Sequence, residues 1–332
     1  MTPSQTATIR ANSAVLWAYA FHDGRAEPLD DADAHAADPR DGGWTWTHLP
    51  LSDQRARSFI EQFEPLPEPA RALILAAEPR VQIQYAGDWA FGVLPDVQWG
   101  LDPGMQDAGR LQFAFCDRWL ITARRHALRS VDELRRKVAA GLELDCPAEA
   151  WIELIERYVE LNEVRLHELS ESIDRIEARL LGEDVDPDGL AVGPVRRELS
   201  RRRREVSALR TALGRASAPR SGQRLAMLGE LLPSLVHEVE DYDREAASLQ
   251  ERARLLHEEI DTRLAGDANR SMRALTVFST LLIPPTLIVG AFGMNLGGLP
   301  FEHNPHGFAE ASLLCVVTVG AACALLRRWR IL

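Results

Sequence analysis

The chain has 332 residues, of which 46% are hydrophobic and 26% charged, and its formal net charge is -11. This length allows one or two soluble domains plus a membrane anchor, and the acidic balance argues against nucleic acid as a partner, because a phosphate backbone requires a basic surface. Four cysteines without a CxxC spacing indicate neither a disulfide framework nor a zinc finger: Cys116, Cys146, Cys315 and Cys323.

Residues 1–146 have the pattern of a cytoplasmic α/β domain. No apolar run with a basic flank opens the chain, so we expect no secretory signal peptide. Strands are predicted where aromatic and β-branched residues lie between Gly, Pro and Asp, at Val15–Phe21, Trp44–His48, Val81–Tyr85, Trp89–Leu94, Leu111–Cys116 and Trp119–Ala123. Helices are predicted at Ser52–Phe63, Pro69–Ala77 and Ser130–Ala140.

This domain has no pattern of a catalyst. It contains no phosphate-cradling glycine loop, no nucleophile elbow and no HExxH sequence. His48 beside Trp44 and Trp46 is either a ligand or a structural residue of a strand. The sequence therefore predicts a regulatory or assembly module and not an enzyme.

Residues 147–271 are predicted to be helical. Apolar residues recur at three and four from Pro147 to Leu181, and a second helix is predicted at Pro194–Leu213. The second helix carries the run 201–204, four arginines that either form a solvated face or pair with acidic helices of the same or a neighbouring subunit. A third helix is predicted to run from near Gln223 into the membrane, with weak points at Pro233 and Gly266.

That third helix would form a long acidic stalk. From Gln223 to Phe292 it covers 70 residues, roughly 105 Å at 1.5 Å per residue. Residues 223–262 carry ten acidic residues, Glu258 and Asp261 among them, against four arginines. Such charges are solvated in one copy, whereas several copies around an axis would form a negative funnel that attracts cations.

The C-terminal part, 272–326, is predicted to be a transmembrane hairpin. Ala274–Phe292 is free of charge and long enough to cross a bilayer, and the spans are placed at about 272–292 and 308–326, with an outer loop at 293–307. Lys and Arg are absent from that loop, whereas arginines precede the first span and occupy the tail 327–332. The positive-inside rule then predicts that both termini are cytoplasmic.

One face of the first span is polar or small. Asn269, Met272, Leu275 with Thr276, Ser279, Ile283, Thr286 and Gly290 recur at three or four. Such a face either packs against another helix or lines a water-filled path. A single hairpin cannot enclose a pore, so the path requires a symmetric ring of subunits.

The outer end of this span carries candidate ion ligands. Gly293 and the pair 297–298 allow tight turns, and Asn295 offers an uncharged amide oxygen that can hold a hydrated divalent cation such as Mg²⁺. His303 and His306 in the loop are either Zn²⁺ ligands or polar loop residues.

These motifs together resemble the CorA superfamily of divalent-cation transporters. Gly293-Met294-Asn295 closes the first span and follows Asn269-x-x-Met272-x-x-Leu275-Thr276 and Pro284-x-Thr286, while Gly297-Gly298-Leu299-Pro300 is more similar to the ZntB-like zinc branch. The resemblance implies a homopentamer whose first span lines the pore. It implies a selectivity filter at Gly293, Met294 and Asn295, a pore wall at Asn269, Met272, Leu275, Ser279, Ile283 and Thr286, and a regulatory acidic residue at Glu258.

The expected function is divalent-cation transport across the cell inner membrane. Zn²⁺ uptake, with or without proton coupling, is the first hypothesis, and a Mg²⁺, Co²⁺ or Ni²⁺ channel of the CorA type is the alternative. A membrane-anchored scaffold or sensor is a third hypothesis, which leaves the Gly-Met-Asn sequence unexplained. No cofactor is expected beside the transported ion, and the expected partners are the lipid bilayer and four further copies of the chain.

Overall fold

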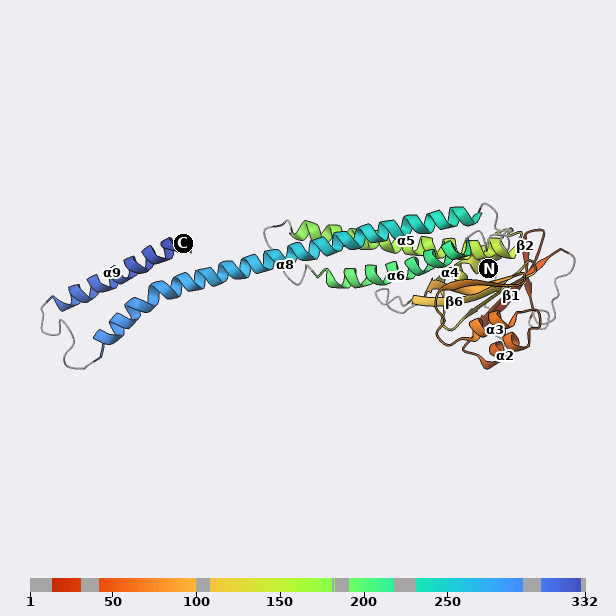
Figure 1. Cartoon of the computed structure of the whole chain (residues 1–332), viewed down its shortest axis with the longest axis horizontal. Coiled ribbons are helices and arrows are strands. Elements are labelled where there is room, and N and C mark those ends of the chain that lie inside the picture. The colour runs from red at the N-terminus through yellow and green to blue at the C-terminus, as the bar shows by residue number, and fades with distance from the viewer. Residues whose placement is uncertain are drawn as a thin grey trace, which may run out of the picture. The chain divides into compact units, whose positions relative to one another are not determined.

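The computed structural model describes residues 14–30, 42–99, 108–180, 182, 191–217, 231–294 and 306–329. The chain divides into two compact units, Met1–Arg254 and Leu255–Leu332. The first unit contains a mixed β-sheet and a bundle of long helices, and the second contains the apolar C-terminal helices (Figure 1).

The first unit is built on one seven-stranded sheet of order β2-β1-β3-β7-β6-β5-β4. The strands are β1 (Trp17–His22), β2 (Arg25–Leu29), β3 (Trp44–Pro50), β4 (Gln82–Ala86), β5 (Trp89–Val97), β6 (Ala108–Phe115) and β7 (Trp119–Arg124). Only β3 and β7 are parallel among these pairs, and every other pairing is antiparallel. All six predicted strands are confirmed, with boundaries that differ by up to three residues.

Strand β2 is a strand that sequence reasoning missed. Its Glu27 and Pro28 disfavour a central strand, and it lies at the sheet edge, where it pairs with β1 only. The two-residue turn Asp23-Gly24 connects the two strands, and both residues have positive φ, 48° and 77°. An Asp-Gly turn is a strong hairpin signal, and it could have identified β2.

Helices cover both faces of the sheet. On one face, α2 (Gln54–Gln62) and α3 (Glu68–Leu75) pack with Ile60 and Ile74 against Phe91 and other apolar strand residues. On the opposite face lie α4 (Arg129–Ala139) and the start of α5 (Pro147–Leu180) (Figure 1). There the Trp151 ring is 5.6 Å from that of Phe113 and 5.5 Å from that of Phe115, and this contact anchors α5 to the sheet.

A helical bundle continues from the sheet. It consists of α5, α6 (Gly193–Ala216) and the first part of α8 (Leu231–Phe292). The buried residues of α8 in this unit alternate at spacings of three and four: Leu232, Leu235, Val239, Tyr242, Ala246, Leu249 and Ala253. This is the heptad spacing of a coiled coil. It places the apolar residues on one side of α8, where other helices of the same chain bury them.

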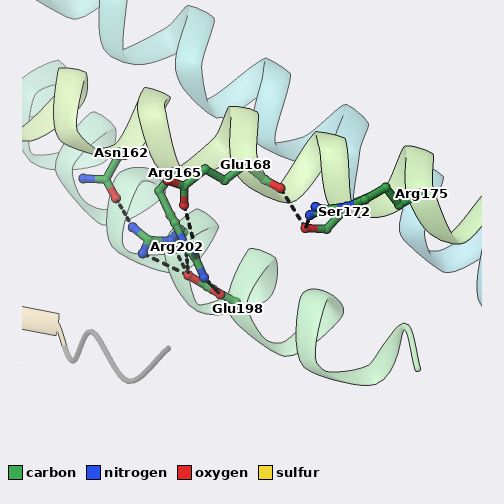
Figure 2. Close-up of polar contacts among 7 residues, drawn as sticks. All are labelled: Asn162, Arg165, Glu168, Ser172, Arg175, Glu198 and Arg202. Carbon is green, nitrogen blue, oxygen red and sulfur yellow. Dashed lines mark hydrogen bonds and ion pairs between the residues drawn. The ribbon is translucent and has the colours of Figure 1, made fainter. Parts of the chain in front are cut away.

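A buried polar network joins α5 to α6 (Figure 2). Arg202 donates to Glu198 Oε1 at 3.0 Å and to Asn162 Oδ1 at 2.7 Å. Arg165 from α5 donates to both oxygens of Glu198 at 2.8 Å. Burial alone would raise the pKa of Glu198, but hydrogen bonds from Arg165 and the charge of Arg202 lower it below its ordinary value. One arginine of the run 201–204 is therefore a buried partner of an acidic residue and not a solvated charge.

In the second unit, α8 continues as one helix to Phe292, and α9 spans Gly307–Arg328. Both helices are long and apolar enough to cross a membrane. This confirms the predicted architecture, an N-terminal sheet domain, a long stalk helix and a C-terminal pair of apolar helices. Pro233 and Gly266 do not interrupt α8, and its predicted start at Gln223 lies outside the described residues.

Candidate ion pathway

The first apolar helix segment carries the predicted polar stripe on an open surface. Met272 and Leu275 are each 68% exposed, Ile283 is 63% exposed, and Ser279 is half-buried. No described residue of α8 from Asp261 onward is buried. In one copy of the chain the stripe is therefore exposed. Such an apolar surface must be covered by another helix or by lipid.

The threonine hydroxyls of this segment donate to the backbone of their own helix. Thr276 donates to the Met272 carbonyl at 2.8 Å, Thr280 to the Thr276 carbonyl at 2.8 Å, and Thr286 to the Leu282 carbonyl at 2.7 Å. Each hydroxyl hydrogen is thus used within the helix, and the oxygen lone pairs stay free to accept. A wall of such oxygens can accept hydrogen bonds from the water shell of a cation.

Thr280 was not among the predicted pathway residues. It lies at the edge of the predicted stripe, four residues after Thr276, and forms the same hydroxyl-to-carbonyl bond. Its position at i+4 from a predicted residue was the signal that could have identified it.

Two prolines interrupt the hydrogen-bond ladder of α8 near the middle of its apolar segment. Pro284 and Pro285 lie inside the helix. Because proline has no N–H, the carbonyls four residues earlier, Thr280 and Leu281, lose their usual amide donors. Inside a bilayer such carbonyl oxygens need a partner from another helix or from water.

The segment from Ala274 to Phe292 contains no ionisable side chain. Arg273 precedes it, and one turn earlier Arg270 pairs with Asp267 at 3.4 Å. A divalent ion on this path would therefore meet hydroxyl and carbonyl oxygens and no fixed charge. Uncharged oxygens hold a hydrated ion weakly enough to release it.

The predicted filter lies at the end of α8. The amide of Gly293 donates to the Val289 carbonyl at 2.9 Å, and that of Met294 to the Ala291 carbonyl at 3.3 Å, so the chain keeps helical hydrogen bonds up to Met294. Gly293 does not adopt a positive φ. Asn295, the third residue of the predicted filter, lies outside the described residues.

Only one of the two predicted loop histidines, His306, lies within the described residues. His306 directly precedes α9, where its carbonyl accepts from the Glu310 amide at 3.1 Å, and His303 lies outside the described residues. In the described part of the chain, no group of three or more His, Cys, Asp or Glu side chains could hold a metal ion. The zinc-ligand hypothesis for these histidines stays a prediction.

The candidate regulatory residues Glu258 and Asp261 are exposed on α8. His257 lies one turn before Asp261, with its Nε2 atom 3.6 Å from Asp261 Oδ2. Both carboxylates belong to the exposed side of the helix, as an acidic funnel wall requires.

His48 has a structural role in the sheet. It is fully buried, its Nδ1 atom lies 2.8 Å from Thr122 Oγ1, and its ring stacks on Trp17 at 4.7 Å. Burial, aided by the charges of Arg124 and Arg135, holds the pKa of His48 well below its ordinary value. The neutral ring is thus part of the core and faces no open site.

Comparisons with known proteins identify the family. The family model described as "CorA-like Mg2+ transporter protein" matches residues 41–328. The "Zinc transport protein ZntB" of Yersinia enterocolitica is 22% identical over 278 residues, which cover 82% of this chain and 84% of that protein. The protein of the same name from Pectobacterium atrosepticum is 22% identical over 291 residues, covering 85% of this chain and 86% of that protein.

Solved structures show the same fold. The full-length CmaX protein superposes with a TM-score of 0.81 at 21% identity, covering 96% of this chain and 99% of that chain. The CorA magnesium transporter from Methanocaldococcus jannaschii gives a TM-score of 0.70 at 16% identity, covering 94% and 97%. Since the family model spans most of the sequence, this chain belongs to the CorA-like Mg²⁺ transporter family.

Proposed function

We propose that this protein transports divalent cations across the cell inner membrane through a path lined by the polar stripe of α8. One observation carries the proposal. In this member of a transporter family, the apolar segment of α8 presents uncharged side chains with acceptor oxygens, and no other part of the described chain buries them. The residues assigned to the wall are Asn269, Met272, Leu275, Ser279, Ile283 and Thr286.

The path requires several copies of the chain around one axis, because a hairpin alone encloses nothing. We assign five copies, the number that the CorA resemblance implies. In such a ring the stripe of α8 faces the axis, and α9 stands between α8 and the lipid. Met272 and Leu275 then form an apolar constriction near the cytoplasmic end.

The filter is assigned to Gly293, Met294 and Asn295 at the outer end of the path. Five asparagine amide oxygens would hold the ion through its water shell, which suits ions that give up water reluctantly. The ion then moves between hydroxyl and carbonyl oxygens on the wall. Since none of these groups is charged, no site along the span traps the ion.

We assign Zn²⁺ as the transported ion. Support comes from relatives named zinc transport proteins, which match over most of the chain, and from the tail Gly297-Gly298-Leu299-Pro300. The family model is named for Mg²⁺, so Mg²⁺ transport is the second candidate.

Transport is assigned the inward direction, with both termini in the cytoplasm. Arginines flank both spans on the terminal sides, and the loop 293–307 carries none. The membrane potential alone favours inward movement of a divalent ion by roughly 4.6 kcal/mol per 100 mV. Proton coupling would have to use groups outside Ala274–Phe292, because that segment contains no ionisable side chain.

Flux in proteoliposomes tests this function. Purified protein is reconstituted with an ion-sensitive dye inside, and Zn²⁺, Mg²⁺, Co²⁺ or Ni²⁺ is added outside, with and without a pH gradient. We expect Zn²⁺ entry that rises with an inside-negative potential. Entry of Mg²⁺ but not Zn²⁺ would select the second candidate, and absence of flux for all four ions, with a stable oligomer present, would reject transport.

A further inference from the structure

A groove in the first unit is strongly basic. It lies between α5 and the N-terminal half of α6 and has a volume of about 910 Å³. Among the described residues, one carboxylate, that of Glu198, and five arginines line it: Arg165, Arg196, Arg197, Arg201 and Arg204. An uneven charge of this kind attracts anions into the groove.

Glu198, the carboxylate among the described lining residues, is already engaged by two arginines. Both oxygens of Glu198 already accept from Arg165 at 2.8 Å, and Oε1 also accepts from Arg202, which does not line the groove, at 3.0 Å (Figure 2). Arg165 also donates to Glu168 at 2.6 Å. Within the described residues, this network engages Glu198 and leaves Arg196, Arg197 and Arg204 without a carboxylate partner.

Three arginines that line the groove have side-chain nitrogens without a partner among the described residues: Arg196, Arg197 and Arg204. Arg204 donates through Nε to the Ser200 carbonyl at 3.3 Å, which leaves its two terminal nitrogens for other partners. Within the described part of the chain, the guanidinium groups of Arg196 and Arg197 form no hydrogen bond or ion pair. Arg197 folds back toward the start of α6, where a Cβ atom built on Gly193 would lie 3.5 Å from its Nη1 atom.

We propose that this groove binds a small anion carrying two or more phosphoryl groups, such as a nucleoside di- or triphosphate or inorganic pyrophosphate. Planar guanidinium groups bind phosphoryl oxygens in bidentate pairs. Arg197 and Arg204 are seven residues apart on α6 and therefore lie two turns apart on one face, a spacing that suits two phosphoryl groups better than one.

Three further features fit such a ligand. The volume lies within the range of small-molecule sites, about 300–1,000 Å³. Beside the charged rim, Leu169 and Val195 give the groove an apolar patch against which a base or sugar can pack. The first turn of α6, starting at Gly193, adds the partial positive charge of a helix N-terminus.

The site does not depend on the proposed transport, because all its residues belong to the unit that ends at Arg254. The test uses the full-length protein in detergent and isothermal titration with pyrophosphate, ATP and AMP. The groove variant is Arg197→Ala with Arg204→Ala. The control is Arg244→Ala with Arg254→Ala, which removes two exposed arginines of α8 that pair with Asp241 and Glu251.

We expect saturable binding of pyrophosphate and ATP, with AMP at least tenfold weaker. The groove variant should lose about 100-fold in affinity, roughly tenfold for each lost charge-assisted contact, and the control should stay within about threefold, because its arginines do not line the groove. Affinity should also fall as salt is raised. Should the alanine pair unfold, Arg197→Lys with Arg204→Lys keeps the charge but not the bidentate geometry, and we expect an intermediate loss.

Three results would overturn the proposal. Equal losses in the groove and control variants would show unspecific charge attraction, and unchanged affinity in the groove variant would place the ligand elsewhere. Absence of binding to all three probes would mean that another surface, for example an acidic face of a second copy, occupies the groove. Vesicles containing phosphatidic acid form a further arm: competition with pyrophosphate would identify a lipid headgroup as the source of the phosphoryl group.

Discussion

The two halves of α8 are one continuous helix with opposite environments. From Leu232 to Ile260, apolar residues recur at three and four and are buried by the same chain. From Asp261 to Phe292, no residue is buried, although the sequence becomes more apolar. The first half completes a core, and the second half presents a surface that requires partners.

This contrast shows that hydrophobicity and burial are separate properties of a helix. The first half is rich in charge yet buried, because its apolar residues follow a heptad and meet α5 and α6. From Ala274 to Phe292 the second half has no charged residue, as is typical of a helix that crosses a bilayer. Stability should therefore respond to changes in the first half, and transport to changes in the second.

The largest effect should come from the filter. Asn295→Ala removes the amide oxygen that we assign to the hydrated ion, and it should abolish flux in proteoliposomes while the oligomer stays intact in size-exclusion chromatography. Asn304→Ala, in the same loop, is the matched control and should transport normally. Normal flux in the Asn295 variant would reject the filter assignment.

A buried residue of the first half should control stability. Leu235 is 1% exposed and Leu255 is 52% exposed, so Leu235→Ala should cost roughly 3 kcal/mol and Leu255→Ala less than about 1 kcal/mol. Tryptophan fluorescence during thermal unfolding measures this, because seven of the eight tryptophans lie at or before Trp151. Equal shifts in melting temperature would contradict the contrast between the halves.

The hydroxyls of the second half should affect rate and not stability. Thr286→Val keeps the shape of the side chain but removes an acceptor oxygen from every copy, and it should lower flux about tenfold. Thr318→Val on α9 is the control, because that hydroxyl also donates to its own helix, to the Cys315 carbonyl at 2.9 Å. A fall in flux of equal size in both variants would place the wall elsewhere.

The smallest effect should come from a crowded carboxylate of the first half. Partial burial, followed by the charges of Glu156, Glu163 and Glu160, raises the pKa of Glu238. The pKa of Glu238 is thus higher in the folded than in the unfolded protein. The contribution of Glu238 to the free energy of unfolding is therefore highest below the ordinary pKa of Glu, and it falls as the pH rises through the folded-state pKa.

Glu238→Gln should therefore stabilise the protein near neutral pH, by less than about 1 kcal/mol because solvent screens the half-exposed group. The gain should vanish below pH 4.5, the ordinary Glu value, where the native carboxyl is neutral. Glu240→Gln, on the exposed side of the same turn, serves as the control. A gain that persists in acid would point to helix propensity and not to charge.

Much of the fold could be predicted because its signals are local. Strands such as Trp89–Val97 are rich in aromatic residues. The apolar run after Arg273 is as long as a helix that crosses a bilayer. The polar stripe could also be placed on one helix face by spacing alone.

Other features depend on tertiary contacts and escaped prediction. The burial of Arg202 follows from Asn162 and Glu198, which lie 40 residues and 4 residues away in sequence. The back-bonding of Thr276, Thr280 and Thr286 depends on side-chain rotamers that spacing does not reveal. The number of copies in the proposed ring depends on contacts between chains, and one sequence contains no local signal for it.

The segment 261–273 of α8 has neither a core nor an apolar run to support it. Its helical form is supported by exposed pairs such as Glu259 with Arg263 and Asp267 with Arg270, each contributing about 0.2–0.5 kcal/mol, and Gly266 weakens it by about 1 kcal/mol relative to Ala. These pairs are exposed, and salt screens exposed pairs. The link between the buried and the apolar part of α8 should therefore be the first part of this helix to lose hydrogen-exchange protection as salt is raised.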